Sequence, residues 1–250
     1  MKAALSIIIL AQNEAKNLEN LLPTLSWAKE IILVNDHSID NTIKVSKKHR
    51  AKIVNIKKSL TFSKLRNLGL SKASNQWVLF IDADERVGDK LKDEILSVIK
   101  IKNNSIKGYF LKRQDYFLCK KLTHGETANI KLLRLAQKGS GKWTRPVHEV
   151  WNITGPKKTL TNVLEHSPHP TISQFLSQIN HYTDIEANLR VSQKKSWNFF
   201  STLAYPLAKF FVNYITNLGF LDGFPGLIMA YIMSLHSLIV RIKLYEKTRT

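Results

Sequence analysis

Apolar residues in the first hundred positions alternate between two spacings. Continuous runs rich in β-branched residues predict buried strands at 5–11, 30–35, 52–56 and 77–81. Between these runs, leucine and isoleucine recur every three or four residues, which predicts helices. Strands that alternate with helices predict a parallel sheet with right-handed crossovers. Because ligands of such sheets bind beyond the carboxyl ends of the strands, we expect the chemistry of this chain to lie there.

The pattern changes in the second half of the chain. Strands are expected at 108–113 and 130–135, and from residue 172 the chain is predicted to be helical almost throughout. We therefore expect a catalytic domain over 1–168 and a C-terminal helical region over 169–250. Residues 224–240 form an apolar stretch of 17 positions, which is marginal for a membrane span because a span needs about 20.

The net charge indicates which class of partner the chain binds. The chain has 38 Lys and Arg against 19 Asp and Glu, a formal charge of +19, and such an excess indicates a polyanionic partner. The basic residues are scattered and the tail is apolar, so an anionic membrane surface is favoured over nucleic acid. A basic, non-enzymatic protein that binds nucleic acid or a membrane remains the alternative from a different class.

Cysteine content and the N-terminus bear on the compartment. A single cysteine, Cys119, excludes an intramolecular disulfide and a thiolate zinc site. The N-terminal apolar run is short and lacks a small-residue cleavage site, so a buried strand is favoured over a signal peptide. We expect a cytoplasmic protein that is peripheral on the inner face of the cell membrane.

Two aspartates follow the fourth expected strand, in the order Asp82-Ala83-Asp84. Carboxylates one residue apart can share a hard divalent cation, such as Mg²⁺ or Mn²⁺, which can hold a diphosphate at its other positions. The spacing alone is common by chance, and a solvated turn is the alternative. Their position at the end of a buried strand favours a metal site formed by Asp84 and Asp82.

Other polar residues follow the first and second expected strands. Asn13 and Glu14 come after the first strand, and Asp36 after the second, where it can accept hydrogen bonds from a nucleoside. Arg66 lies on the helix before the aspartate pair and can bind phosphate or pair with a carboxylate. Each of these residues has a structural alternative, such as an Asx turn or a helix cap. Their convergence on one sheet edge predicts a pocket for a nucleotide and a metal.

These motifs together resemble glycosyltransferase family 2, the A-type nucleotide-sugar glycosyltransferases. The matching residues are the Asn13-Glu14 pair, the turn 34–40, the Arg66-Asn67-Leu68-Gly69 helix and the Asp-x-Asp motif at 82–84. Asn35 and His37 depart from the pattern, which has Asp and Gly there. Within the family, 82–86, 145–149 and 219–223 resemble the branch of lipopolysaccharide-core β-1,4-glucosyltransferases, which are bacterial enzymes.

The resemblance implies a Rossmann-like, mostly parallel sheet between helices and a metal-dependent, inverting sugar transfer. It implies UDP-glucose as the donor, a lipopolysaccharide-core or lipid-linked saccharide as the acceptor, and Asn13, Glu14, Asp36, Arg66 and Asp82 as nucleotide-binding residues. A carboxylate must then remove the acceptor proton. We expect Glu149 to be this base, with Glu126 as the second candidate. His166 is expected to serve packing or the surface, because its spacing from other histidines does not indicate metal binding.

Overall fold

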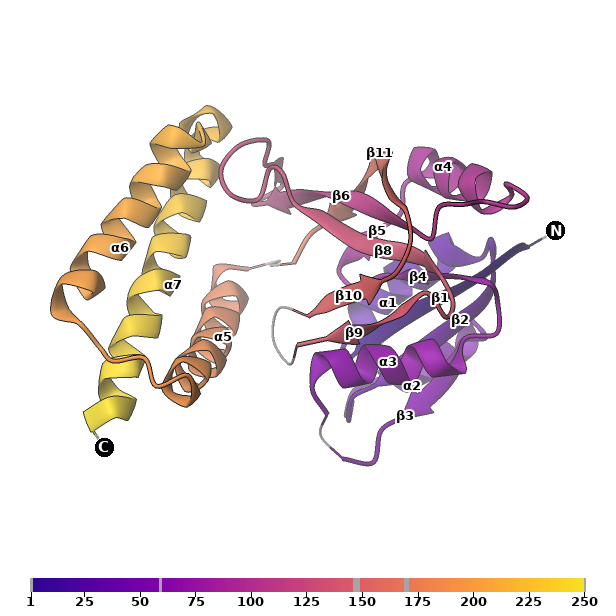
Figure 1. The fold of residues 1–250 in the computed structure, drawn as a ribbon, viewed down its shortest axis with the longest axis horizontal. Helices are drawn as coiled ribbons and strands as arrows, with labels where there is room; N and C mark the ends of the chain where they lie inside the picture. Colours follow the sequence, from indigo (N-terminus) through magenta and orange to yellow (C-terminus); the bar gives the residue numbers. More distant parts are fainter. Residues whose placement is uncertain (1, 59, 146–148, 169–170, 250) are drawn as a thin grey trace. The chain divides into compact units, whose positions relative to one another are not determined.

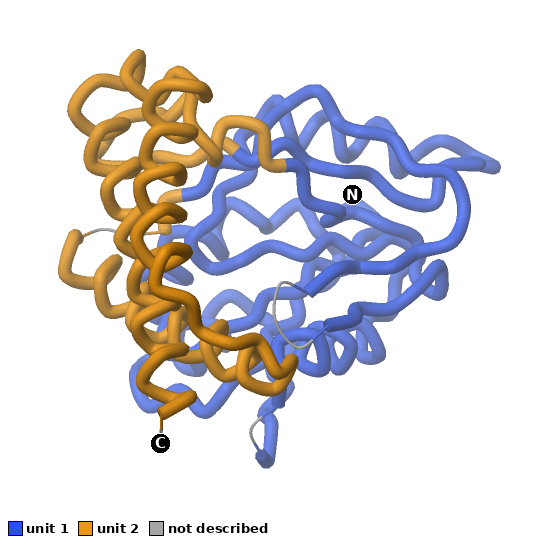
Figure 2. The backbone as a smooth tube through the Cα atoms, turned by 60° about the vertical axis from the view of Figure 1, so that its left-hand side comes forward, with its two compact units in different colours: residues 1–113, 131–166 blue, residues 114–130, 167–250 orange. Residues whose placement is uncertain are grey.

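The computed structural model describes residues 2–58, 60–145, 149–168 and 171–249, and its chain divides into two compact units. The first unit comprises residues 1–113 and 131–166, and the second comprises 114–130 and 167–250 (Figure 2). The second unit therefore contains, besides the expected helical region, a segment from the middle of the chain. Contacts within that unit explain this assignment, because the backbone amides of Thr123 and His124 donate to the Asp222 carboxylate at 3.0 and 2.8 Å.

A mixed sheet forms the centre of the first unit (Figure 1). Its strand order is β3-β2-β1-β4-β8-β6-β11-β5, with β7 paired to β6. The first four strands in this order are parallel, as expected, and β8 lies antiparallel to both β4 and β6. The strands are β1 (Ala3–Ala11), β2 (Ala28–Asn35), β3 (Lys52–Asn55), β4 (Trp77–Phe80), β5 (Glu85–Arg86), β6 (Gly108–Phe117), β7 (Lys120–Lys121), β8 (Lys131–Gln137) and β11 (Lys157–His166).

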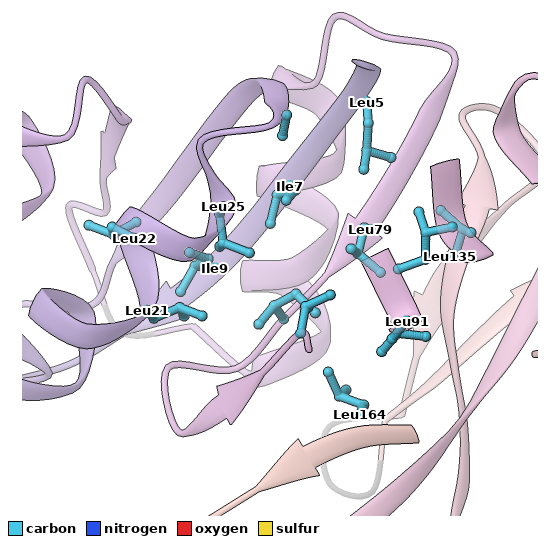
Figure 3. Close-up of a cluster of buried hydrophobic side chains, with 14 of the residues drawn as sticks. Leu5, Ile7, Ile9, Leu21, Leu22, Leu25, Leu79, Leu91, Leu135 and Leu164 are labelled. Carbon is cyan, nitrogen blue, oxygen red and sulfur yellow. The ribbon is translucent and has the colours of Figure 1, made fainter. Parts of the chain in front are cut away.

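Helices cover both faces of this sheet, because alternate residues of its central strands are buried on opposite sides. Ile7 and Ile9 of β1 pack with α1 (Ala15–Leu21), η1 (Leu22–Leu25) and α4 (Asp89–Ile99) in one cluster, part of which Figure 3 shows. Ile8 packs on the other face with α3 (Phe62–Lys72) and the hairpin of β9 (Gly141–Thr144) and β10 (Val150–Ile153). Helix α2 (Thr42–Lys48) connects β2 to β3. The α/β class is therefore confirmed.

The second unit is mainly helical. It contains α5 (Ile172–Ser192), α6 (Phe199–Phe211), η2 (Val212–Thr216), η3 (Gly219–Asp222) and α7 (Gly223–Arg249). Helices α6 and α7 run antiparallel to each other (Figure 1). A small core contains Phe117, Phe175, Ile179 and Ile232. By length and composition alone, the stretch Gly219–Arg249 is sufficiently apolar to cross a membrane, which is weak evidence for membrane association.

Candidate active site

The carboxyl ends of β1, β2 and β4 meet at one edge of the sheet. The three strands are neighbours, and the amide of Asp36 donates to the Ala11 carbonyl at 2.9 Å, while that of Ile81 donates to the Ile8 carbonyl at 3.1 Å. The segments that follow these strands therefore start side by side. They carry most of the polar residues that the sequence indicates for the site.

Asn13 organises the loop after β2 with its own side chain. Its Oδ1 accepts from the Ile39 amide at 2.8 Å, and its backbone amide donates to Ser38 Oγ at 3.0 Å. Next to it, the Glu14 amide donates to Thr42 Oγ1 at 2.8 Å. The carboxamide of Asn13 thus connects the ends of β1 and β2.

Glu14 belongs to an acidic rim together with the Asp-x-Asp motif. Its Oε2 accepts from Asn17 Nδ2 at 2.7 Å. Burial raises the pKa of Glu14, and the nearby charges of Asp84, Asp40 and Asp82 raise it further. Repulsion among these carboxylates favours a cation or a hydrogen-bond donor at this edge.

Asp36 lies in the turn after β2, where its Oδ1 is 3.0 Å from His37 Nδ1 and its side chain is 24% exposed. The two departures from the family pattern have structural roles in this turn. Asn35 donates through Nδ2 to Asn55 Oδ1 at 3.0 Å, which joins the ends of β2 and β3. His37 has φ of 53°, the left-handed conformation that explains a glycine at this position in the resembled pattern.

Two arginines hold Asp82. Its Oδ1 accepts from Arg66 Nη2 at 3.0 Å, and its Oδ2 accepts from Arg134 Nη2. Although burial opposes ionisation, the charges of Arg134 and Arg66 hold the pKa of Asp82 well below its usual range. Both carboxylate oxygens are therefore engaged by arginines, and a shared cation at Asp82 and Asp84 stays a prediction.

Arg134 also pairs with Glu85, which is fully buried. Arg134 Nη2 lies 2.9 Å from Glu85 Oε1, while Glu85 Oε2 accepts from the Asp82 amide at 2.8 Å. Burial raises the pKa of Glu85 to about 7, against the attraction of Arg134 and with a contribution from the Asp82 charge. The sequence motifs do not include Arg134, although it is the one charged residue inside the apolar run 132–136, which overlaps a predicted strand.

Asp84 lies beside His166, a histidine that was expected to serve packing or the surface. His166 Nε2 is 3.5 Å from Asp84 Oδ2, and β11 places His166 opposite Glu85 in an antiparallel pair with β5. A carboxylate oxygen and an imidazole nitrogen at this separation fit two adjacent positions around a divalent cation. Among the described residues no cluster of three or more His, Cys, Asp or Glu side chains is placed to hold a metal.

Arg66 connects Asp82 to Glu149. Its Nε donates to Glu149 Oε1 at 3.0 Å, and its guanidinium lies 4.6 Å from the centre of the Trp143 ring. Glu149 is 17% exposed at this point. Residues 146–148, which precede it in the resembled motif, lie outside the described residues.

Glu126, the second candidate for the base, belongs to the second unit. Its Oε2 accepts from Asn213 Nδ2 at 3.2 Å and also forms an ion pair with Lys209. These contacts give Glu126 a structural role in joining the segment 114–130 to α6 and η2.

Two bacterial proteins match nearly the whole chain in sequence. The chain is 24% identical over 256 residues to the lipopolysaccharide core biosynthesis glycosyltransferase LpsC of Rhizobium meliloti, covering 98% of this chain and 93% of that protein. It is also 24% identical to an uncharacterised glycosyltransferase of Rickettsia typhi, covering 98% and 88%.

Two solved structures share the fold. The mannosyltransferase PcManGT of Pyrobaculum calidifontis, in complex with GDP-Man and Mn²⁺, superposes with a TM-score of 0.58 at 10% identity, covering 99% and 88% of the chains. S. aureus TarS in complex with UDP-GlcNAc gives 0.51 at 13%, covering 100% and 92%. The family model for glycosyl transferase family 2 matches residues 6–115, so this segment of the chain is similar to that family.

Proposed function

We propose that this enzyme transfers a sugar, with inversion, from a nucleoside-diphosphate donor to a saccharide or lipid-linked acceptor. The observation that carries the proposal is the Arg66 bridge. Its guanidinium contacts Asp82 on the donor side and Glu149 on the other, both at 3.0 Å. A donor-binding carboxylate and a candidate base therefore lie within the reach of one side chain.

Each residue of the site would have a separate role in a single-displacement reaction. Asp84 and His166 would hold a divalent cation, Mg²⁺ or Mn²⁺, which neutralises charge on the diphosphate leaving group. Glu14 and Asp36 would contact the nucleoside. Asp82, fixed by Arg66 and Arg134, would accept from the donor. Glu149 would remove the proton of the acceptor hydroxyl as its oxygen attacks the sugar.

UDP-glucose and a lipopolysaccharide-core acceptor are the specific substrates that we propose. Similarity to LpsC over 98% of the chain supports an acceptor of this class. The two structural neighbours contain different nucleotides, GDP-Man in one and UDP-GlcNAc in the other. The donor must therefore be identified by measurement.

Calorimetric titration with UDP-, GDP- and dTDP-sugars, with and without Mn²⁺ or Mg²⁺, tests the donor site. We expect one of the nucleotide sugars to bind only when the cation is present. Asp84→Ala should lose this cation-dependent binding. The matched control is Asp89→Ala, whose side chain is 92% exposed on α4 and which should bind like wild type. Equal cation-dependent binding by Asp84→Ala would contradict the proposed site.

We also propose that the second unit lies on the membrane, where it would meet a lipid-linked acceptor. One stripe of α6 consists of Phe200, Leu203, Leu207 and Phe211, which are 53–77% exposed. A peripheral position is favoured over a span because α7 packs along the polar helix α5, where Lys243 pairs with Asp184 at 2.9 Å. An α7 that crossed the bilayer would take these charges into hydrocarbon.

A further inference from the structure

A basic and aromatic pocket lies within the second unit, where the connection from α5 to α6 meets the end of α7. Its volume is about 440 Å³, and its lining includes Lys194, Lys195, Trp197, Tyr245, Thr248 and Arg249. In Figure 1 the connection between α5 and α6 passes next to the C-terminal end of α7. Two segments about fifty residues apart in sequence thus build one pocket.

The backbone fixes the two lysines at the end of α5. The amide of Lys194 donates to the Val191 carbonyl at 2.9 Å, and that of Lys195 donates to the Arg190 carbonyl at 3.0 Å. Lys194 has φ of 56°, so the chain reverses at this residue. The helix end therefore presents two adjacent cations at a defined position.

Aromatic rings form the other part of the pocket. The centres of the Trp197 and Tyr245 rings are 4.6 Å apart, and the Arg249 guanidinium lies 4.5 Å from the centre of the Tyr245 ring. Within the described part of the chain, Lys194, Lys195 and Arg249 form no ion pair with a carboxylate. Among the described residues, the three cations around the pocket therefore have no carboxylate partner, which indicates an anionic ligand.

The exposed apolar stripe begins directly beside this pocket. Trp197 contacts Phe199 with ring centres 6.3 Å apart, and Phe199 and Phe200 are 55% and 77% exposed at the start of α6. At a membrane surface, phenylalanine enters the acyl region, tryptophan and tyrosine lie at headgroup level, and lysine and arginine contact phosphates. The order of residues 194–200 follows this sequence of depths.

We propose that this pocket binds the phosphate of an anionic phospholipid headgroup and so anchors the second unit to the membrane. This proposal rests on the proposed membrane location and adds a defined site for the headgroup. A diffuse positive charge would attract any anionic surface in proportion to net charge. Binding of a headgroup in a pocket instead depends on the particular side chains that line it.

Vesicle co-sedimentation with the full chain tests the pocket. The variant carries Lys194→Asn, Lys195→Gln and Arg249→Gln, with Asn at position 194 because it tolerates a positive φ. The control carries Lys47→Gln, Lys48→Gln and Lys102→Gln, which are exposed lysines of the first unit. Both lower the formal charge of +19 by three, so non-specific attraction falls equally.

We expect the pocket variant to bind vesicles that contain phosphatidylglycerol on the order of 100-fold more weakly than wild type, from roughly fivefold per lost cation near an anionic surface. The control should lose less than tenfold, and neither should change nucleotide binding in the first unit. If the two variants lost equal vesicle affinity, the proposed headgroup pocket would be wrong. The proposed membrane association of the second unit would still stand. If wild type failed to sediment with these vesicles, the membrane location and the pocket would both be wrong, while sugar transfer could still be assayed separately.

Competition with free glycerol phosphate distinguishes the source of the phosphate. We expect millimolar glycerol phosphate, at constant ionic strength, to leave vesicle binding unchanged, because the apolar contacts of Phe199 and Phe200 require a bilayer. Displacement of wild type at that concentration would indicate a soluble phosphate ligand and would overturn the proposal. Circular dichroism melts of both variants check that loss of binding is not loss of folding.

Discussion

At the scale of single residues, the site depends on charges that compensate one another in a buried setting. Arg134 is 4% exposed, and it donates hydrogen bonds to both Asp82 and Glu85. Arg66 is 6% exposed and serves both Asp82 and Glu149. Because the two arginines share Asp82, loss of Arg134 leaves Glu85 without an arginine partner, and loss of Arg66 leaves Glu149 without one.

Replacement of Arg134 by methionine should destabilise the first unit by about 3–5 kcal/mol, because it leaves a buried carboxylate unpaired. Chemical denaturation measures this loss. Lys131→Met, at an exposed position on the same strand β8, is the control and should stay within about 0.5 kcal/mol of wild type. A loss of under 1 kcal/mol for Arg134→Met would show that Glu85 is accommodated without this arginine.

Glu149→Gln removes the candidate base but keeps a hydrogen-bond acceptor for Arg66 Nε. We expect transfer to fall by about 10²–10⁴-fold, the usual contribution of a general base, with donor binding retained. Turnover and calorimetry on the same preparation separate the two effects. Glu19→Gln, on the exposed side of α1, should match wild type in both. Wild-type turnover in Glu149→Gln would remove Glu149 from the mechanism.

At the scale of elements, α3 explains why the Arg66-Asn67-Leu68-Gly69 motif has this order. Arg66 faces the carboxylates, while Asn67 forms a pair of hydrogen bonds with the Trp143 backbone at 2.8 and 2.9 Å. Gly69 lies against the sheet, where a Cβ atom would come within 2.5 Å of Ile8 Cγ2. Arg66 thus contacts the carboxylates of the site, Asn67 contacts the β9 hairpin, and Gly69 packs against the sheet.

Gly69→Ala should therefore destabilise the protein, although alanine favours helices. The overpacking cost is about 1–3 kcal/mol, against a gain of about 1 kcal/mol in helix propensity. Gly88→Ala is the control, because no atom lies within 4 Å of its added Cβ. Thermal unfolding compares the two. A higher melting temperature for Gly69→Ala would show that α3 moves away from β1 at little cost.

At the scale of the whole molecule, positive charge and exposed apolar surface occur together. The chain has a formal charge of +19, and large apolar side chains on α6 remain exposed within the second unit. An ordinary amphipathic helix buries its apolar stripe, whereas the only α6 residue counted as buried among those described is Pro206. The apolar side of α6 is thus available to a membrane.

Phe200→Glu combined with Leu207→Glu should weaken binding to anionic vesicles by at least tenfold, because both apolar insertion and attraction are lost. Folding should be unaffected, since these side chains are 77% and 72% exposed. Ile39→Glu combined with Ile101→Glu, at apolar residues of the first unit that are 93% and 55% exposed, controls for two added charges. Unchanged sedimentation of the double variant would exclude α6 as the membrane contact.

The sequence by itself determined the alternation of strands and helices, the ends of β1, β2 and β4, and the Asp-x-Asp motif, because these features follow from local periodicity and from the parallel connections between adjacent strands. It also indicated Glu149 through family resemblance. Only the tertiary structure decided that Arg134 and His166 join the site. They lie on β8 and β11, at least 50 residues after Asp82 and Asp84, and the pairings of β8 with β4 and of β11 with β5 bring them there. Local spacing carries no information about such antiparallel pairings, since their register is set by packing across the sheet.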